Sequence, residues 1–219
     1  MERMSQNLTG KVALVTGSSR GIGAAAALRL AQHGADVAIS YFSSAQAAER
    51  VADQVRSLGV KAITVKADVS QEEDIKALFT RVVGELGRVD IVLSNSGIEH
   101  FGAVLDGVPE HAIYAASKAA IQGMVKCLAY DFGSRNITVN AIAPGGVKTD
   151  MYTEAAAKYI PGGESMTEEE IDANLSKWSP LSRPGFPDDI SGVVALLASP
   201  EALWLTGQTF HVSGGAQMV

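Results

Sequence analysis

Short runs of aliphatic and β-branched residues alternate along the chain with longer alanine-rich segments whose apolar residues recur at helical spacing. In the first half the runs are Val12–Val15, Asp36–Ser40, Ala62–Lys66 and Asp90–Leu93, and the helical segments between them are Gly21–His33, Ala45–Leu58 and Glu72–Leu86. Strands and helices that alternate in this way are joined by right-handed crossovers into a parallel sheet covered on both faces. The pattern therefore predicts a doubly wound α/β fold.

The same alternation continues in the second half of the chain. It predicts, in order, a helix at Ala112–Phe132, a strand at Ile137–Ile142, a helix at Pro187–Ala198 and a strand at Gln208–Val212. Between these elements, residues 150–186 are long and irregular, and Thr167-Glu168-Glu169-Glu170 has the spacing of a capping box. We expect a lid-like excursion there with a short helix inside it, within one domain that spans residues 1–219.

Composition narrows the classes of partner. The 219 residues carry 18 Lys and Arg against 24 Asp and Glu, a net charge of −6, which argues against nucleic acid and anionic membranes as partners. Cys127 stands alone and the four histidines are scattered, so neither a disulfide nor a metal site is expected. The first apolar run is too short for a signal peptide, and no apolar stretch reaches about 18 residues. These features predict a cytoplasmic protein.

A glycine-rich loop, Thr16-Gly17-Ser18-Ser19-Arg20-Gly21-Ile22-Gly23, follows the first predicted strand and opens the first predicted helix. Gly17 permits a tight turn, Gly21 lets the backbone approach a pyrophosphate, and Gly23 allows close packing of the helix on the strand. Ordinary turn chemistry is the alternative. The position between strand and helix favours a dinucleotide site formed by Gly17, Ser19, Arg20, Gly21, Ile22 and Gly23.

The end of the second predicted strand bears on the choice of dinucleotide. An NAD site usually has a carboxylate there, whereas this chain has Ser40-Tyr41-Phe42-Ser43-Ser44. Arg20, together with hydroxyl groups such as those of Tyr41 and Ser43, suits the 2′-phosphate of NADPH. We therefore expect NADPH/NADP as the cofactor. The alternative for Arg20 is a solvated loop cation.

Tyr114 and Lys118 are spaced by four residues in a predicted helix, which places the phenol and the ammonium on one face. A phenol with a pKa near 10 is a poor acid at neutral pH, but a neighbouring cation favours its ionised form. Such a pair can move a proton to or from a carbinol oxygen. Pairs at this spacing also occur by chance on solvated helices, so the interpretation depends on the other motifs.

Taken together, the motifs resemble those of the short-chain dehydrogenase/reductase family, which has a Rossmann-type fold. The matching segments are Thr16–Gly23, Asp68-Val69, Ser94–Gly97, Tyr114–Lys118, Pro144–Thr149 and Thr206-Gly207. They occur in the family's order over nearly the whole chain. The resemblance implies that Tyr114 donates a proton and that Lys118 lowers the pKa of Tyr114 and holds the nicotinamide ribose.

The resemblance also implies further cofactor contacts. Asp68 and Val69 would contact adenine, and Asn95, Ser96 and Gly97 would pass under the cofactor. The segment that contains Pro144, Gly145, Val147 and Thr149 would hold the carboxamide and the phosphates. Two alternatives are open, because Asn95 could be a turn residue and Thr149 a helix cap.

Within the family, Ser94–Gly97, Asp150–Tyr152, Tyr159–Gly163 and Trp178–Leu181 resemble fungal hydroxynaphthalene and versicolorin (anthraquinone) reductases of polyketide pathways. That subgroup implies a small aromatic polyketide substrate, a flat polyphenol held between aromatic rings of the lid. Tyr152 and Trp178 match those rings, and Ile98 and Met218 would line the same pocket. Ordinary core packing of the two rings is the alternative. The expected reaction is hydride transfer from NADPH to a carbonyl or keto tautomer in fungal secondary metabolism.

One part of the family pattern is absent. Only 16 residues separate Gly97 from Tyr114, too few for a crossover helix, a strand and its exit loop. The family has there a helix and an interior strand whose serine hydrogen-bonds the substrate carbonyl, so the break predicted at about Asp106/Gly107 removes both. His111 or Ser96 is a candidate substitute for this serine. A catalytically impaired NADP-binding relative or truncated isoform is therefore the alternative function, and the family's homo-oligomer interface would be partly lost.

Overall fold

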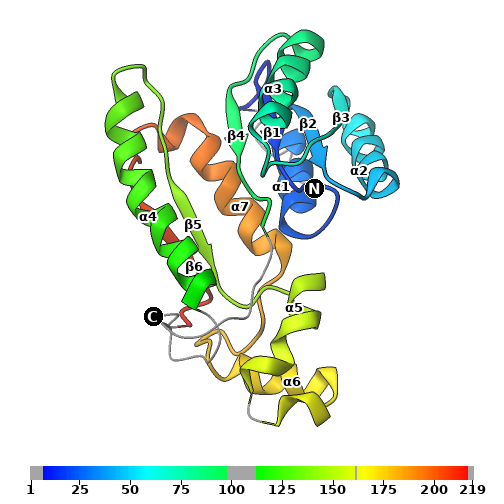
Figure 1. The fold of residues 1–219 in the computed structure, drawn as a ribbon, viewed down its shortest axis with the longest axis vertical. Coiled ribbons are helices and arrows are strands. Elements are labelled where there is room, and N and C mark those ends of the chain that lie inside the picture. The colour runs from blue at the N-terminus through cyan, green and yellow to red at the C-terminus, as the bar shows by residue number, and fades with distance from the viewer. Residues whose placement is uncertain (1–6, 98–111, 161, 217–219) are drawn as a thin grey trace. The chain divides into compact units, whose positions relative to one another are not determined.

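The computed structural model of the chain describes residues 7–97, 112–160 and 162–216 (Figure 1). The chain divides into two compact units, residues 1–97 with residues 190–200, and residues 98–189 with residues 201–219. The elements of the first unit up to residue 97 are β1 (Val12–Val15), α1 (Gly21–Gln32), β2 (Asp36–Tyr41), α2 (Ala45–Ser57), β3 (Ala62–Lys66), α3 (Glu72–Leu86) and β4 (Ile91–Leu93). Each predicted element of this half is present, with bounds that differ by at most one residue.

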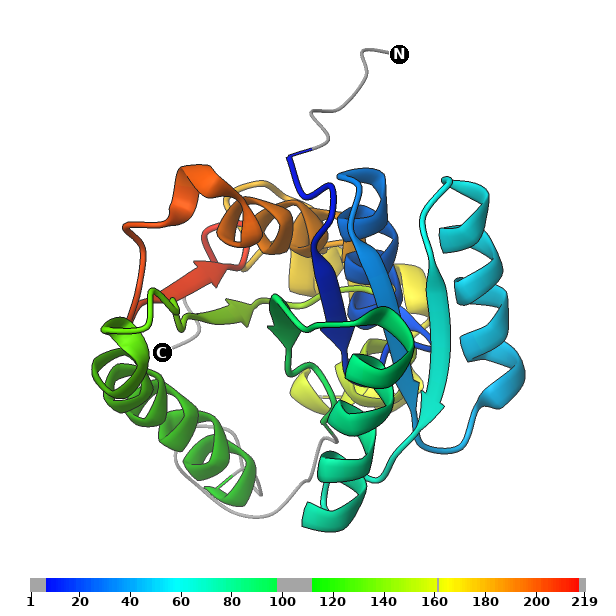
Figure 2. The ribbon, with the colours of Figure 1, turned by 90° about the horizontal axis from the view of Figure 1, so that it is seen from above.

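The strands of the first unit form a parallel sheet in the order β3-β2-β1-β4. β1 lies inside this sheet and is buried along its whole length, as its uninterrupted apolar sequence indicates. Alternate residues Val12 and Leu14 pack with Leu78 and Val82 of α3 in one cluster. Figure 2 shows α1 and α3 on opposite faces of this sheet. These features confirm the predicted doubly wound α/β fold.

Asp90, directly before β4, fixes that strand beside β1. Its carboxylate accepts a hydrogen bond from the backbone N–H of Val12 at 3.0 Å and one from Arg88 at 2.6 Å, and its own N–H donates to the carbonyl of Val12. Burial alone would raise the pKa of Asp90, but the Val12 N–H, Arg88 and Lys11 outweigh burial and lower it. The ionised carboxylate therefore stabilises this end of the sheet.

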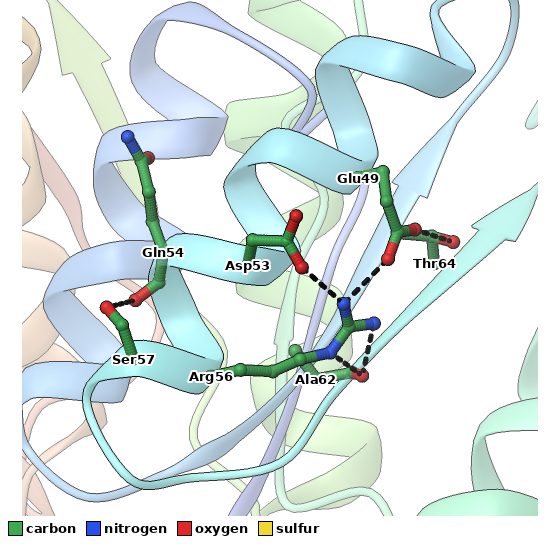
Figure 3. A network of polar contacts seen from close by, with 7 residues as sticks. All are labelled: Glu49, Asp53, Gln54, Arg56, Ser57, Ala62 and Thr64. Atoms are coloured by element: carbon green, nitrogen blue, oxygen red, sulfur yellow. Dashed lines mark hydrogen bonds and ion pairs between the residues drawn. The ribbon is translucent and has the colours of Figure 1, made fainter.

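A second polar network joins α2 to β3 (Figure 3). The Arg56 guanidinium lies 2.6 Å from Glu49 and 2.8 Å from Asp53, and it also donates to the carbonyl of Ala62. Glu49 in turn accepts from the Thr64 hydroxyl at 3.0 Å. Hydrogen bonds from Arg56 and Thr64 lower the pKa of Glu49. The network fixes the end of α2 against the strand that follows it.

The second half of the chain contains α4 (Ala112–Gly133), β5 (Ala141–Pro144), α5 (Asp150–Ala155), the short 3-10 helices η1 (Ala156–Tyr159) and η2 (Gly163–Ser165), α6 (Glu168–Ser176), α7 (Pro187–Ala198), η3 (Pro200–Ala202) and β6 (Thr209–Val212). β5 and β6 pair in parallel as a sheet of two strands. The predicted capping box is present at the start of α6, where the Thr167 side chain accepts from Glu170 N–H and Glu170 accepts from Thr167 N–H.

The predicted strand at 137–142 is wrong in its bounds, because β5 begins only at Ala141. The preceding residues combine one backbone hydrogen bond, from the Gly207 N–H to the carbonyl of Val139, with bonds that involve side chains. The Val139 N–H donates to the Thr206 hydroxyl, and the Asn140 side chain donates to the carbonyl of Leu205 and accepts from the N–H of Gln208. Asn140 therefore ends the β5–β6 pairing at its amino end.

In chain order, no strand lies between β4 and β5 within the described residues. β4 is the edge of the first sheet, and the side chain of its central residue, Val92, is 52% exposed. An edge strand keeps one row of backbone N–H and C=O groups outside the ladder. Within the first unit, β1 is the only described strand that pairs with β4.

Candidate functional site

The glycine loop has the backbone conformation that its glycines permit. Gly17 and Gly21 have φ angles of +62° and +57°, in the left-handed region that strains other residues. Gly23 lies so close to the loop that an added Cβ would stand 2.5 Å from the carbonyl oxygen of Gly17 and 2.6 Å from the side-chain nitrogen of Asn95. The φ angle of Gly17 agrees with the predicted tight turn, whereas the atoms nearest to Gly23 belong to the loop and to Asn95 and not to the strand.

Asn95 and Ser96, at the end of β4, brace this loop. The Asn95 side chain donates to the carbonyl oxygens of Thr16 and Gly17 at 3.1 and 3.2 Å. The Thr16 hydroxyl accepts from the backbone N–H groups of Asn95 and Ser96 at 3.0 and 3.1 Å. Asn95 is thus more than a turn residue, because its amide satisfies two carbonyl groups of the loop. Ser96 and Gly97 are exposed.

Ser18 fastens the other side of the loop. Its side chain is fully buried, its hydroxyl donates to the carbonyl of Val15 at 2.7 Å, and its N–H donates to the carbonyl of Ser40 at the end of β2. Sequence reasoning gave no role to Ser18 or to the Thr16 hydroxyl. Their place in the motif, directly after a buried strand, is the only signal in the sequence that could have identified them.

The amino end of α1 suits an anion. Its N-cap residue, Arg20, makes no side-chain cap, and its first turn contains no acidic residue. The helix N-terminus therefore presents backbone N–H groups and the positive end of the helix dipole. It lies next to a loop whose positive φ angles at Gly17 and Gly21 favour glycine. Ser19, Gly21 and Ile22 are half-buried there, and Arg20 is exposed. These residues fit the diphosphate of a dinucleotide.

The groups predicted to hold the adenosine end belong to the same unit. Tyr41 is half-buried at the end of β2, and Ser43 is exposed two residues later. Asp68 forms a turn in which its carboxylate accepts from the Ser70 N–H at 2.9 Å, and hydrogen bonds from Ser70 lower its pKa. Val69 is exposed, so its apolar side chain is accessible for contact with an adenine ring. The adenine contacts of Asp68 and Val69 stay predictions.

Tyr114 and Lys118 lie together near the start of α4. The Lys118 ammonium is 5.1 Å from the centroid of the Tyr114 ring, which is the geometry of a cation–π contact. Tyr114 is half-buried and Lys118 is exposed. The helical spacing thus brings phenol and ammonium together as predicted.

The segment after β5 is held by close backbone contacts. An added Cβ at Gly145 would stand 2.8 Å from the Cα of Ser213, so Gly145 is required by packing. Buried Val147 bridges to Gly185, and Pro144 is exposed. Thr149 is the N-cap of α5, since its hydroxyl accepts from the Tyr152 N–H at 3.3 Å. Thr149 is thus a helix cap, and its cofactor contact stays a prediction.

The two predicted lid aromatics differ in exposure. Tyr152 is 8% exposed and its hydroxyl donates to Asp172, whereas Trp178 is 53% exposed. Trp178 therefore has free ring area for a flat ligand, and Tyr152 has little. Ile98 and Met218 lie outside the described residues, as does His111.

Neither a metal site nor a membrane span is found in the part of the chain that the structure describes. Among residues 7–97, 112–160 and 162–216, no three His, Cys, Asp or Glu side chains group so that they could hold a metal ion. No described helix combines the length and the hydrophobicity needed to cross a bilayer.

Comparison with known sequences matches two family models. The model described as short chain dehydrogenase matches residues 11–107, and the one described as enoyl-(acyl carrier protein) reductase matches residues 100–217. The two matches meet where the motif spacing predicts the break, at about Asp106/Gly107.

Curated relatives match the chain nearly end to end. The probable tetrahydroxynaphthalene reductase of Zymoseptoria tritici is 40% identical over 259 residues, which cover 98% of this chain and 97% of the relative. Versicolorin reductase of Emericella nidulans is 41% identical over 254 residues, covering 95% and 96%. Because the chain has 219 residues, at least 40 of the 259 positions aligned with the first relative have no residue here.

Solved structures agree with the sequence matches. Angucycline C-6 ketoreductase with bound NADP is 32% identical, with a TM-score of 0.82 and coverage of 99% of each chain. A short chain dehydrogenase from Burkholderia cenocepacia in complex with NADP is 32% identical, with a TM-score of 0.82 over 96% of this chain and 99% of that one. The motifs, the glycine-loop geometry and these matches lead to one conclusion: the chain belongs to the short-chain dehydrogenase/reductase family.

Proposed function

We propose that this protein is an NADPH-dependent reductase of a flat polyphenolic polyketide, of the hydroxynaphthalene or anthraquinone type, in fungal secondary metabolism. The observation that carries the proposal is the glycine loop, braced by Asn95 and Ser18 in front of an uncapped helix N-terminus. The names of the curated relatives support the substrate class. The exposed Trp178 supports a planar ligand.

Different residues of the chain bind the diphosphate, bind the 2′-phosphate and donate the proton. The turn at Gly17–Gly23 binds the diphosphate through backbone N–H groups, and Asn95 keeps that turn in place. Arg20, with Tyr41 and Ser43, binds the 2′-phosphate, since the segment after β2 carries no carboxylate. When bound, NADPH supplies the hydride. Tyr114 donates a proton from its hydroxyl to the substrate oxygen, and Lys118 lies over its ring and holds the nicotinamide ribose.

Purified 219-residue protein tests this directly. NADPH oxidation would be followed with a hydroxynaphthol or an anthrahydroquinone as substrate, and the product would be identified by mass spectrometry. Arg20→Ala is expected to raise the KM for NADPH about tenfold and to leave the KM for NADH nearly unchanged, because only NADPH carries the 2′-phosphate. An NADPH preference that survives this substitution would refute the role of Arg20.

A second function, NADP binding with impaired catalysis, is favoured by one observation. At least 40 aligned positions of the relatives are absent, and the family resemblance places the carbonyl-binding serine among them. Losing one such donor lowers kcat about a hundredfold, which is on the order of 3 kcal/mol. Heat of NADPH binding in calorimetry without detectable turnover would establish this second function. Heat together with turnover would establish the first.

A further inference from the structure

Besides Tyr114 and Lys118, the chain contains two tyrosine–lysine pairs at four-residue spacing in the reversed order, Lys126/Tyr130 and Lys148/Tyr152. In the Lys148/Tyr152 pair a carboxylate joins the two side chains. The Tyr152 hydroxyl donates to one oxygen of Asp172 at 2.8 Å, and the Lys148 ammonium pairs with the other oxygen. Lys148 also lies 3.2 Å from Glu168.

The three central residues come from three different elements. Lys148 belongs to the segment after β5, Tyr152 to α5 and Asp172 to α6. Tyr152 is buried, and the side chains of Lys148 and Asp172 are 28% and 21% exposed, so water screens their contact only partly. The Glu168 side chain is 63% exposed and lies at the solvent-facing side of the cluster. The cluster therefore ties both lid helices to the end of the sheet.

The charges in this cluster keep its protons in place. Burial, followed by the hydrogen bond to Asp172 and the charges of Asp172 and Glu168, raises the pKa of Tyr152. Hydrogen bonds to Asp172 and Glu168 raise the pKa of Lys148. Tyr152 thus stays a hydrogen-bond donor and Lys148 a cation at neutral pH. Lys148 and Tyr152 therefore keep their bonds to Asp172 in place and do not serve as a proton donor and acceptor.

Helix α6 connects the cluster to the exposed aromatic ring of the lid. Asp172 is the central residue of α6, and Trp178 follows the end of this helix, with the Trp178 N–H donating to the carbonyl of Leu175 at 3.0 Å. Directly after Trp178, the buried Ser179 donates from its hydroxyl to the carbonyl of Gly214 at 2.7 Å. The segment that carries Trp178 is therefore held on both sides, by Asp172 and by Ser179.

We infer that Asp172 is a positioning residue for substrate, which clasps α5 and α6 through Tyr152 and Lys148 and so sets the place of the Trp178 ring. This inference rests on the proposed function, since it assigns the lid to binding of a flat aromatic substrate. We call the cluster of Lys148, Tyr152 and Asp172 the clasp. Because Tyr152 belongs to the clasp, Trp178 is the lid aromatic that stacks on the substrate.

Asp172→Asn and Asp172→Ala test the clasp, with Glu169→Gln as the matched control that removes one negative charge from an exposed position of the same helix. We expect Asp172→Ala to raise the KM for the polyphenol about tenfold, with kcat changed less than about threefold and NADPH affinity unchanged in calorimetry. Asp172→Asn keeps an acceptor for Tyr152 but loses the charge opposite Lys148, so its KM falls between those of Asp172→Ala and the wild type.

A second measurement does not depend on turnover. Trypsin cleaves after Lys158 and Lys177, which lie in or beside the lid helices, and mass spectrometry reports the rate at each site. We expect cleavage at these sites to be about tenfold faster in Asp172→Ala than in Glu169→Gln. If cleavage and KM of both Asp172 variants match the control, the clasp is refuted. Faster cleavage of the Asp172 variants with an unchanged KM for the polyphenol would refute the role of Asp172 in positioning substrate. Absence of turnover by the wild type would refute the proposed function. In that case the trypsin rates would still test whether Asp172 holds α5 and α6 together.

Discussion

Replacing Gly23 with alanine tests the link between loop packing and dinucleotide binding. The added methyl group would stand 2.5 Å from the Gly17 carbonyl oxygen, 2.6 Å from the Asn95 side-chain nitrogen and 2.9 Å from the Ser18 Cα. Two of these three atoms belong to the backbone, so a side-chain rotation cannot relieve the contact. The glycine loop must therefore move away from α1, and the Asn95 side chain must also shift, which breaks its brace.

The magnitude follows from the contacts. Overpacking of a close-packed site costs about 1–3 kcal/mol, and a broken Asn95 brace leaves two loop carbonyls without that amide, at about 1 kcal/mol each. Alanine recovers at most about 1 kcal/mol of helix propensity. We therefore expect Gly23→Ala to lower the free energy of unfolding by about 2 kcal/mol and to weaken NADPH binding at least tenfold.

Gly84→Ala is the matched control, because Gly84 lies in α3 and an added Cβ there meets no atom within 4 Å. This variant should gain up to about 1 kcal/mol of stability and bind NADPH as the wild type does. Urea unfolding measures the stability of each variant, and calorimetry measures the dissociation constant for NADPH. Wild-type affinity in a folded Gly23→Ala variant would refute the loop as the diphosphate site.

Three further predictions concern single side chains. Tyr114→Phe should lower kcat at least a hundredfold and leave NADPH affinity within about twofold, since only the proton donor is lost; the steady-state rate and calorimetry report the two quantities. Asp90→Ala should lower the free energy of unfolding by about 2 kcal/mol at pH 7, because the buried Val12 N–H loses its acceptor. The lowered folded pKa of Asp90 gives stability above its ordinary pKa that is lost as pH falls, so urea titrations at low pH should show a smaller difference from the wild type. Asp189 has its pKa lowered to about 2 by Arg183, so Asp189→Asn should cost less than about 1 kcal/mol at pH 7, and urea unfolding should show this loss disappear between about pH 4 and pH 2.

Each of these has an outcome that would contradict it. Substantial turnover by Tyr114→Phe would move the proton donor elsewhere. A stability difference for Asp90→Ala that persists unchanged at low pH would show that packing, not charge, explains the loss. A loss for Asp189→Asn that grows on acidification would mean that its carboxylate is protonated more readily in the folded state than in the unfolded one.

The first half of the fold could be predicted from the sequence because its information is local. A strand such as β1 that is buried on both faces must be apolar throughout, and a helix such as α1 repeats its apolar residues at helical spacing. The bounds of β5 could not be predicted in this way. There the side chains of Thr206 and Asn140 bind backbone groups of Val139 and Leu205, and each side chain lies more than 60 positions from its partner.

The same division holds at the site. The sequence alone determined that Gly17 forms a tight turn before a helix and that Tyr114 and Lys118 share a helix face, because turn conformation and helical spacing are properties of neighbouring residues. Only the tertiary structure decided that Asn95 braces the loop, because its partners lie 78 and 79 residues away. It likewise decided that Asp172, which lies 20 residues from Tyr152, accepts the hydrogen bond of that hydroxyl. The sequence of a lid segment does not show whether an aromatic side chain contacts a ligand or a carboxylate. The contact forms only in the folded chain, which brings the distant carboxylate next to the ring.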